Sequence, residues 1–154
     1  MKILICTDGS EHSQQAIRFS LPILKQPNTR VTLLFVAPRV EEEFKFYEEI
    51  FEEAFEKMRE AFKGLKYKDP GVKILEKSRK TLLSRGVEAE TKMRVGDPAE
   101  EILKEVEEGG YDLLVMGSHG WKGIKKFFMG SVTNKVLQNV QIPLLIYKKP
   151  PHKT

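Results

Sequence analysis

The chain alternates between short apolar runs and longer amphipathic stretches. The apolar runs are Lys2–Thr7, Val31–Val36, Val87–Val95, Tyr111–Met116 and Pro143–Tyr147. In the first run Ile3, Leu4 and Ile5 follow one another without a polar residue, which is typical of a parallel strand covered on both faces. The third run alternates, so we expect it to be more exposed than the first two. The pattern predicts five strands.

The stretches between these runs have helical spacing. The predicted helices are Glu11–Lys25, a long one from about Glu41 to Leu65, Val72–Ser84, one that opens at Pro98 and ends at Gly109-Gly110, and Ser131–Asn139. Ser10 and Asp97 precede two of them as N-caps, and Gly86 follows another at the position that glycine favours after a helix. Pro22 lies inside the first helix and should kink it or end it early.

Strands that alternate with helices predict the α/β class. We expect one doubly wound five-stranded parallel sheet with helices on both faces. The 154 residues suit a single domain over residues 1–148, followed by a short polar tail at 149–154. In such sheets, ligands bind beyond the carboxyl ends of the strands, where the strand order reverses. The residues that follow the first, second and fourth strands are therefore the candidates for chemistry.

Composition and charge narrow the class of protein. Hydrophobic residues make up 40% and charged residues 31% of the chain, as in soluble globular proteins. No apolar run approaches the ~20 residues that span a membrane, and the opening run is too short for the core of a signal peptide. A single cysteine, Cys6, suits a reducing compartment, so we expect a cytoplasmic protein. The net charge of +4 is spread along the chain, which argues against a nucleic-acid partner.

Glycines after the fourth strand form the strongest chemical signal. Gly117-Ser118-His119-Gly120 is followed, after nine residues, by Gly130-Ser131. Gly117 and Gly120 let the backbone approach a ligand closely and adopt positive φ. Gly130 opens a helix, and the first N–H groups of a helix attract anions. Two glycine turns that converge on one helix start suit a polyphosphate.

Side chains near these glycines strengthen that interpretation. The hydroxyls of Ser131 and Thr133 can donate hydrogen bonds to phosphate oxygens, and Lys122, Lys125 and Lys126 add positive charge. The alternative, that the glycines only shape turns, stays open on the pattern alone. The pattern favours a phosphate-type ligand over it.

The segment from Val115 to Thr133 resembles the ATP-binding signature of the universal stress protein family. That signature is Gly-x2-Gly-x9-Gly followed by Ser or Thr, and the chain matches its full spacing. The chain is also similar to the family at Thr7-Asp8-Gly9-Ser10, Leu34-Phe35-Val36 and Ile142-Pro143-Leu144-Leu145-Ile146. The resemblance spans nearly the whole chain and is weakest across Glu41–Ser84. Cys6 stands where some members have proline.

The resemblance implies roles for individual residues. Asp8, beside Thr7, and the backbone of Val36 would hold the adenine and ribose, and Met116 and Gly117 would line the ribose. The phosphates would contact Gly120, Gly130, Ser131, Val132 and Thr133. The implied ligand is ATP with Mg²⁺ or Mn²⁺ at its phosphates. The implied function is a nucleotide-dependent stress-response or signalling module, for which a further protein partner is expected.

The last strand bears on assembly. In the expected strand order, 3-2-1-4-5, Pro143–Tyr147 lies at a sheet edge, where unpaired N–H and C=O groups must be shielded or paired. The resemblance implies that this strand pairs with its copy in a homodimer. A loop, or the Phe-rich stretch between Phe44 and Leu65, could cover the edge of a monomer instead.

Missing signatures exclude several other functions. The P-loop pattern Gly-x4-Gly-Lys-Ser/Thr, the Gly-x-Gly-x-x-Gly of dinucleotide sites and the acidic pair of a phosphoaccepting receiver domain are all absent. A phosphoryl- or nucleotidyl-processing enzyme of the same fold remains an alternative. It would need a base or a charge clamp, for which the sequence offers only Asp8, His119 and the loop lysines. We favour binding with at most slow hydrolysis and assign no catalytic residue.

Three residues have plainer interpretations. Asp8 could cap the following helix with one oxygen and leave the other for a ligand. His119 is interpreted as an exposed loop histidine, because no carboxylate or second histidine is near it in sequence. Cys6 is interpreted as a buried strand residue. No cluster has metal-ligand spacing, so we predict no resident metal and expect any metal to arrive with the nucleotide.

Overall fold

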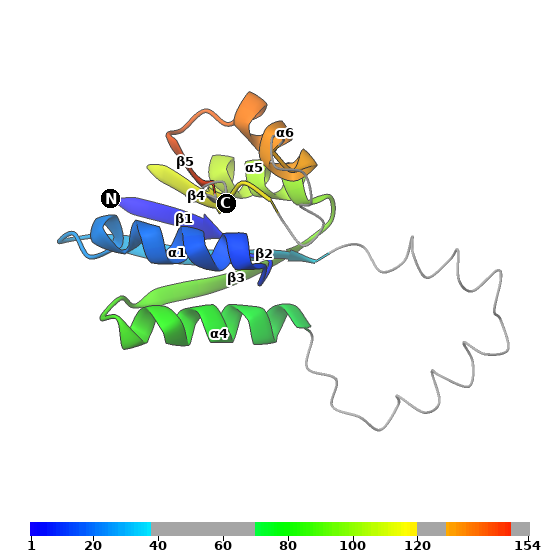
Figure 1. Ribbon diagram of the computed structural model, residues 1–154. Coiled ribbons are helices and arrows are strands. Elements are labelled where there is room, and N and C mark those ends of the chain that lie inside the picture. The colour runs from blue at the N-terminus through cyan, green and yellow to red at the C-terminus, as the bar shows by residue number, and fades with distance from the viewer. Residues whose placement is uncertain (38–69, 120–128, 149–154) are drawn as a thin grey trace, which may run out of the picture.

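The structure, a computed structural model, describes residues 1–37, 70–119 and 129–148 (Figure 1). Its elements in chain order are β1 (Lys2–Cys6), α1 (Glu11–Leu24), β2 (Arg30–Ala37), α4 (Pro70–Ser84), β3 (Ala89–Val95), α5 (Pro98–Gly109), β4 (Leu113–Gly117), α6 (Ser131–Asn139) and β5 (Leu144–Tyr147). These elements confirm the predicted alternation of strands and helices. The helix predicted from Glu41 to Leu65 and the tail at 149–154 lie outside the described residues.

The five strands form one parallel sheet in the order β3-β2-β1-β4-β5. β1 lies at the centre, and its Ile5 is opposite Leu33 of β2 on one side and Val115 of β4 on the other. The order therefore reverses between β1 and β4, and β5 is an edge strand. The predicted fold class and strand order are confirmed.

Side chains of the central strands alternate between two cores. Ile3, Ile5 and Leu33 pack with α1 and α4 on one face of the sheet. Leu4 and Leu34 pack with α5 and α6 on the other face. Figure 1 shows the two helix layers on either side of the sheet. None of these five side chains is more than 1% exposed, which explains why β1 and β2 are continuous apolar runs.

Helix ends follow the local signals in the sequence. The Ser10 side chain caps α1 by accepting a hydrogen bond from Ser13 N at 3.3 Å. The Asp97 side chain caps α5 by accepting one from Glu100 N at 3.0 Å. Gly110 follows α5 in the left-handed conformation, at φ 64°. Among the described helices, none is long and apolar enough to cross a membrane.

The first helix is not cut short by its proline. α1 continues through Pro22 to Leu24, so of the two predicted effects, a kink or an early end, the early end does not occur. A proline lacks the N–H that bonds the carbonyl four residues back, but near the end of a helix only that single bond is lost. Lys25 N still donates to Leu21 O at 3.0 Å, which closes the last turn.

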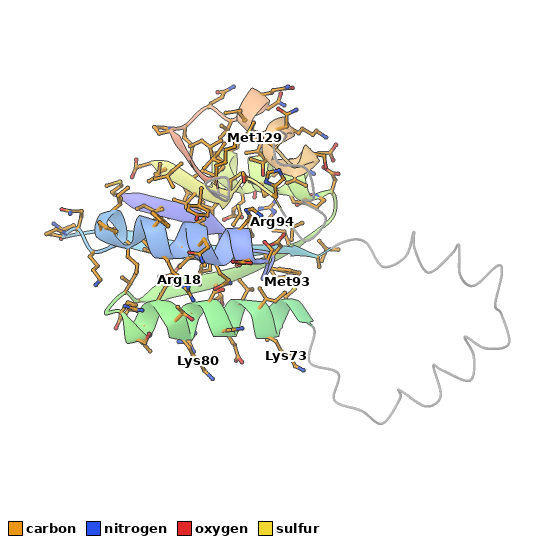
Figure 2. The ribbon with its side chains drawn as sticks, viewed as in Figure 1. Arg18, Lys73, Lys80, Met93, Arg94 and Met129 are labelled. Carbon is orange, nitrogen blue, oxygen red and sulfur yellow. The ribbon has the colours of Figure 1, made fainter. Side chains whose placement is uncertain are left out.

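A cluster of charged and polar side chains links β3 to α5. Lys92 Nζ donates to Glu105 Oε1 at 2.8 Å, Arg94 Nη1 donates to Glu105 Oε2 at 2.7 Å, and Tyr111 Oη donates to Oε1 at 2.8 Å. Glu105 is 2% exposed, so three donors surround one buried carboxylate. Arg94 is labelled in Figure 2, on the face of the sheet opposite Met93, which packs with the α1 and α4 core. As predicted, β3 is more exposed than β1 and β2.

Candidate functional site

The chain leaves the carboxyl edge of the sheet after β1 and after β4, on either side of the point where the strand order reverses. Backbone pairing continues just past the strand ends: Thr7 N donates to Leu34 O at 2.9 Å, and Ser118 N donates to Tyr147 O at 2.9 Å. The loops after β1 and β4 therefore start from fixed positions on either side of the reversal, where doubly wound sheets bind their ligands.

The loop after β1 is held by its own side chains. Thr7 is 4% exposed, and its Oγ1 accepts from Gly9 N at 3.3 Å and from Gln14 Nε2 at 3.4 Å. Asp8 is partly exposed, and its Oδ1 accepts from Ser10 N at 2.9 Å. Ser10, and not Asp8, caps α1, so Asp8 supports the turn that carries the cap. Asp8 thereby lies at the carboxyl edge with its carboxylate partly exposed.

The end of β4 packs closely on the start of α1. A Cβ at Gly117 would lie 2.8 Å from the carbonyl carbon of His12 and 3.0 Å from Ser13 N, so only glycine fits there. Gly117 is not among the described glycines with positive φ, so the prediction that it adopts positive φ was wrong. Glycine at this position allows β4 to approach α1 closely, whereas the sequence predicted a close approach to a ligand. Met116, one residue earlier, is 4% exposed within the α5 and α6 core.

The start of α6 is tied to the end of β4 by two hydrogen bonds. Gly130 N donates to Ser118 O at 2.8 Å, and Thr133 Oγ1 donates to Gly117 O at 2.9 Å. Gly130 has φ −59° and ψ 156°, an extended conformation that any residue adopts. Its glycine is therefore not required by backbone conformation.

The start of α6 is the candidate anion site at this edge. Helical geometry leaves the N–H groups of Ser131, Val132 and Thr133 without an acceptor inside the helix. The positive end of the helix dipole lies at the same place. Ser131 is exposed, whereas Thr133 is 3% exposed and its hydroxyl already donates to β4. Only the Ser131 hydroxyl of the two is therefore placed to donate outward.

The other predicted binding residues are placed as follows. Val36 is partly exposed near the end of β2, opposite Arg94 of β3. Val132 packs partly against the α5 and α6 core. Gly120 and the loop lysines lie outside the described residues. The rest of the predicted set, Thr7, Asp8, Met116, Gly117, Gly130, Ser131 and Thr133, comes from the β1 end, the β4 end and the start of α6.

Two histidines meet beside this edge, which sequence reasoning missed. The rings of His12 and His119 have centroids 5.2 Å apart and an interplanar angle of 52°. Both residues are partly buried. The sequence shows no second histidine near His119, because His12 reaches it only through the packing of α1 on β4. His119 Nδ1 also lies 2.8 Å from Ser118 Oγ.

Cys6, the remaining nucleophile candidate, is inert. Cys6 is a buried strand residue, as predicted, and burial raises the pKa of its thiol well above the ordinary range, with the carboxylates of Glu105 and Asp8 adding to the shift. A thiol of this kind stays protonated and unreactive. Within the described ranges, no group of three or more His, Cys, Asp or Glu side chains is arranged so that it could hold a metal ion.

Known proteins resemble this chain over nearly its whole length. The model of the Universal stress protein family matches residues 1–148. The chain belongs to the universal stress protein family. Relatives of this universal stress protein include YxiE of Bacillus subtilis, 32% identical over 150 residues, which are 96% of this chain and 98% of YxiE. Universal stress protein MJ0531 of Methanocaldococcus jannaschii is 33% identical over 149 residues, which are 97% of this chain and 82% of that protein.

Solved structures of other family members share the fold. Protein MJ0577 of Methanocaldococcus jannaschii aligns with a TM-score of 0.72 and 33% identity, covering 98% of this chain and 97% of that one. A universal stress protein in complex with cAMP aligns with a TM-score of 0.67 and 21% identity, covering 96% and 97%. One from Archaeoglobus fulgidus in complex with dAMP aligns with a TM-score of 0.64 and 18% identity, covering 96% and 98%. The last two similarities concern the fold.

Proposed function

We propose that this universal stress protein binds ATP, with Mg²⁺ or Mn²⁺ at its phosphates, and acts as a nucleotide-dependent stress-response and signalling module. The observation that carries the proposal is the start of α6, which is tied to the end of β4 beside the reversal in strand order. Gly130 N and Thr133 Oγ1 make that connection through Ser118 O and Gly117 O. Backbone N–H groups held at a rigid edge bind phosphate without reorganising.

In this proposal each part of the edge contacts one part of the ligand. Asp8 and the backbone of Val36 hold the adenine and ribose, with Thr7 fixing the loop that carries Asp8. Met116 and Gly117 form the floor below the ribose. The phosphates meet Gly120 and the start of α6, where Ser131 donates its hydroxyl and Val132 its N–H. Thr133 supports the site without contacting the ligand through its hydroxyl, because that hydroxyl donates to Gly117 O of β4.

Two observations support an adenine nucleotide over other anions. The glycine signature after β4 matches the ATP-binding spacing of the family. Family members of the same fold are in complexes with cAMP and with dAMP. Cytoplasmic location and a protein partner that responds to the bound nucleotide remain predictions from the sequence.

Hydrolysis is expected to be slow at best. Phosphoryl transfer needs a base that positions water and charges that stabilise the transferring group. Among the described residues at this edge, Asp8 supports a turn and His119 faces His12 and Ser118. The direct test is the mass of the nucleotide released when the purified protein is denatured: ATP supports a module that holds its ligand intact. Rapid ATP turnover would instead favour an enzyme.

Loss of the Ser131 hydroxyl should weaken ATP but not adenosine. A hydrogen bond to a charged phosphate oxygen contributes about 1.5–3 kcal/mol, so Ser131→Ala should raise the Kd for ATP by about 10- to 150-fold. Adenosine has no phosphate and should bind both proteins equally. Calorimetric titration of each ligand measures the two effects.

The matched control for Ser131→Ala is Ser84→Ala. Ser84 is also exposed, at the end of α4, where its hydroxyl donates to Thr81 O at 2.7 Å. ATP affinity should be the same in this variant and in the parent. If Ser131→Ala weakened ATP and adenosine alike, Ser131 would not contact the phosphates, and its assignment would have to be abandoned.

We also propose that β5 pairs with its copy in a second subunit to form a two-fold homodimer. β5 is the edge strand, and Pro143 O and Tyr147 O accept hydrogen bonds from β4. Because neighbouring residues in a strand point their polar groups to opposite sides, Leu144 and Ile146 direct their N–H and C=O groups away from β4. Those groups are the ones that a second copy of β5 would pair with.

A proline at position 146 should separate the subunits. Ile146→Pro removes an outward N–H without removing a bond to β4, and proline is tolerated at sheet edges. A side-chain change such as Leu145→Lys is less suitable, because Leu145 packs on the core beneath α1. Light scattering at micromolar concentration should give twice 17.7 kDa for the parent and a mass near 17.7 kDa for the variant. A parent of 17.7 kDa would contradict the dimer.

A further inference from the structure

The histidine pair at the carboxyl edge has no role in the proposed nucleotide site. His12 lies in the first turn of α1, and His119 lies two residues beyond β4. Their ring centroids are 5.2 Å apart, and the rings are tilted by 52° rather than stacked. Both residues are partly buried.

Close backbone packing holds the two histidines together. Gly117 lies so near α1 that an added Cβ would be 2.8 Å from the carbonyl carbon of His12. The residues that lead to His119 are in turn anchored to α6, through the bond from Thr133 Oγ1 to Gly117 O and the bond from Gly130 N to Ser118 O. These contacts fix the backbone segments of the two histidines relative to each other.

A buried serine orients one of the rings. Ser118 is 0% exposed, and its Oγ lies 2.8 Å from His119 Nδ1. When Nδ1 carries the ring proton and donates it to Ser118 Oγ, the lone pair of the imidazole is on Nε2. Histidines that bind metals are commonly oriented in this way, with one nitrogen donating to a protein oxygen and the other directed at the ion.

We propose that His12 and His119 form a two-imidazole binding site for a transition-metal ion of the Zn²⁺ type. For a tetrahedral ion with nitrogen ligands at about 2.1 Å, the centroids of two coordinated rings lie about 5 Å apart, which is the separation seen here. Imidazole prefers Zn²⁺, Co²⁺, Ni²⁺ and Cu²⁺ over Mg²⁺ and Ca²⁺. Among the described residues, no third His, Cys, Asp or Glu side chain joins this pair. We expect water or another oxygen ligand to complete the coordination.

An ion bound at this pair should also affect nucleotide binding, an inference that rests on the proposed nucleotide site. Ser118, next to His119, accepts the hydrogen bond from Gly130 at the start of α6. An ion held by the two imidazoles would therefore add positive charge beside the proposed phosphate position and could take a phosphate oxygen as a ligand. ATP and Zn²⁺ would then each raise the affinity for the other.

The test of the metal site uses nucleotide-free protein, so failure of the ATP proposal would not affect it. Calorimetric titration with Zn²⁺ should give one ion bound per chain. His12→Gln and His119→Gln should each weaken Zn²⁺ binding by at least about tenfold, because a single imidazole loses the benefit of chelation. His152→Gln, at the only other histidine of the chain, is the matched control and should bind Zn²⁺ as the parent does.

Side-chain NMR of the parent keeps the proposal testable if a variant fails to fold. Zn²⁺ should shift the ring signals of His12 and His119 together and leave those of His152 unchanged, and Mg²⁺ at the same concentration should shift none. Equal Zn²⁺ affinity in parent and variants, or a shift of only one ring, would overturn the proposal.

Discussion

Gly130→Val should abolish ATP binding while leaving the fold intact. Gly130 immediately precedes α6, and its N–H donates to Ser118 O. Because the phosphates are proposed to lie at the start of α6, a branched side chain at this position would occupy their space. The backbone at Gly130, with φ −59° and ψ 156°, is open to valine. Calorimetry should detect no ATP binding at concentrations that saturate the parent, a loss of more than about 4 kcal/mol if affinity falls over 1000-fold.

Unchanged thermal stability is what makes this variant informative. Because valine fits the backbone conformation, the unfolding temperature of Gly130→Val should stay within about 2 °C of the parent in the absence of nucleotide. Gly130→Ser is the matched variant: serine is a favoured N-cap, so it should keep or raise stability while adding only a small side chain. ATP affinity equal to the parent in Gly130→Val would show that the phosphates are not at the start of α6.

Glu105→Gln should destabilise the fold by about 2–3 kcal/mol. The glutamate is 2% exposed and accepts hydrogen bonds from Lys92, Arg94 and Tyr111. The glutamine amide has the same shape as the carboxylate. It carries no negative charge, and it can direct its NH₂ group toward one of these donors. Denaturant unfolding of parent and variant measures the difference in the free energy of unfolding.

Glu108→Ala is the control for this change, because Glu108 also pairs with Arg94 but has a side chain that is 66% exposed. Exposed ion pairs contribute little, so its loss should cost under about 0.5 kcal/mol. Equal losses in the free energy of unfolding for Glu105→Gln and Glu108→Ala would contradict the claim that burial of Glu105 makes its ion pairs more stabilising than exposed ones.

The stabilisation by Glu105 should depend on pH in one direction. Burial alone raises the pKa of this carboxyl, but the hydrogen bonds from its three donors outweigh burial, and its pKa in the folded state is lowered. The carboxylate therefore stabilises the fold fully above its unfolded pKa of about 4.3 and loses this effect as the pH falls through the lower folded value. The gap between parent and Glu105→Gln should shrink only in acid, below about pH 4.

The sequence by itself determined the architecture and the helix ends. Continuous apolar runs such as Ile3-Leu4-Ile5 are required where a strand is buried between two helix layers, so they predicted the parallel sheet. Ser10, Asp97 and Gly110 act on neighbours only a few residues away, so their capping roles were visible in the chain.

Only the tertiary structure decided what the individual side chains of the site do. Thr133 looked like a phosphate ligand, but its buried hydroxyl donates to Gly117 O, a partner far away in sequence. Gly117 is glycine because α1 packs against it, and Gly130 adopts no conformation that requires glycine. His12 and His119 are far apart in the sequence and meet because α1 packs against β4, the strand that ends at Gly117. Contacts of this kind depend on how close two distant backbone segments come, and local sequence patterns carry no record of that distance.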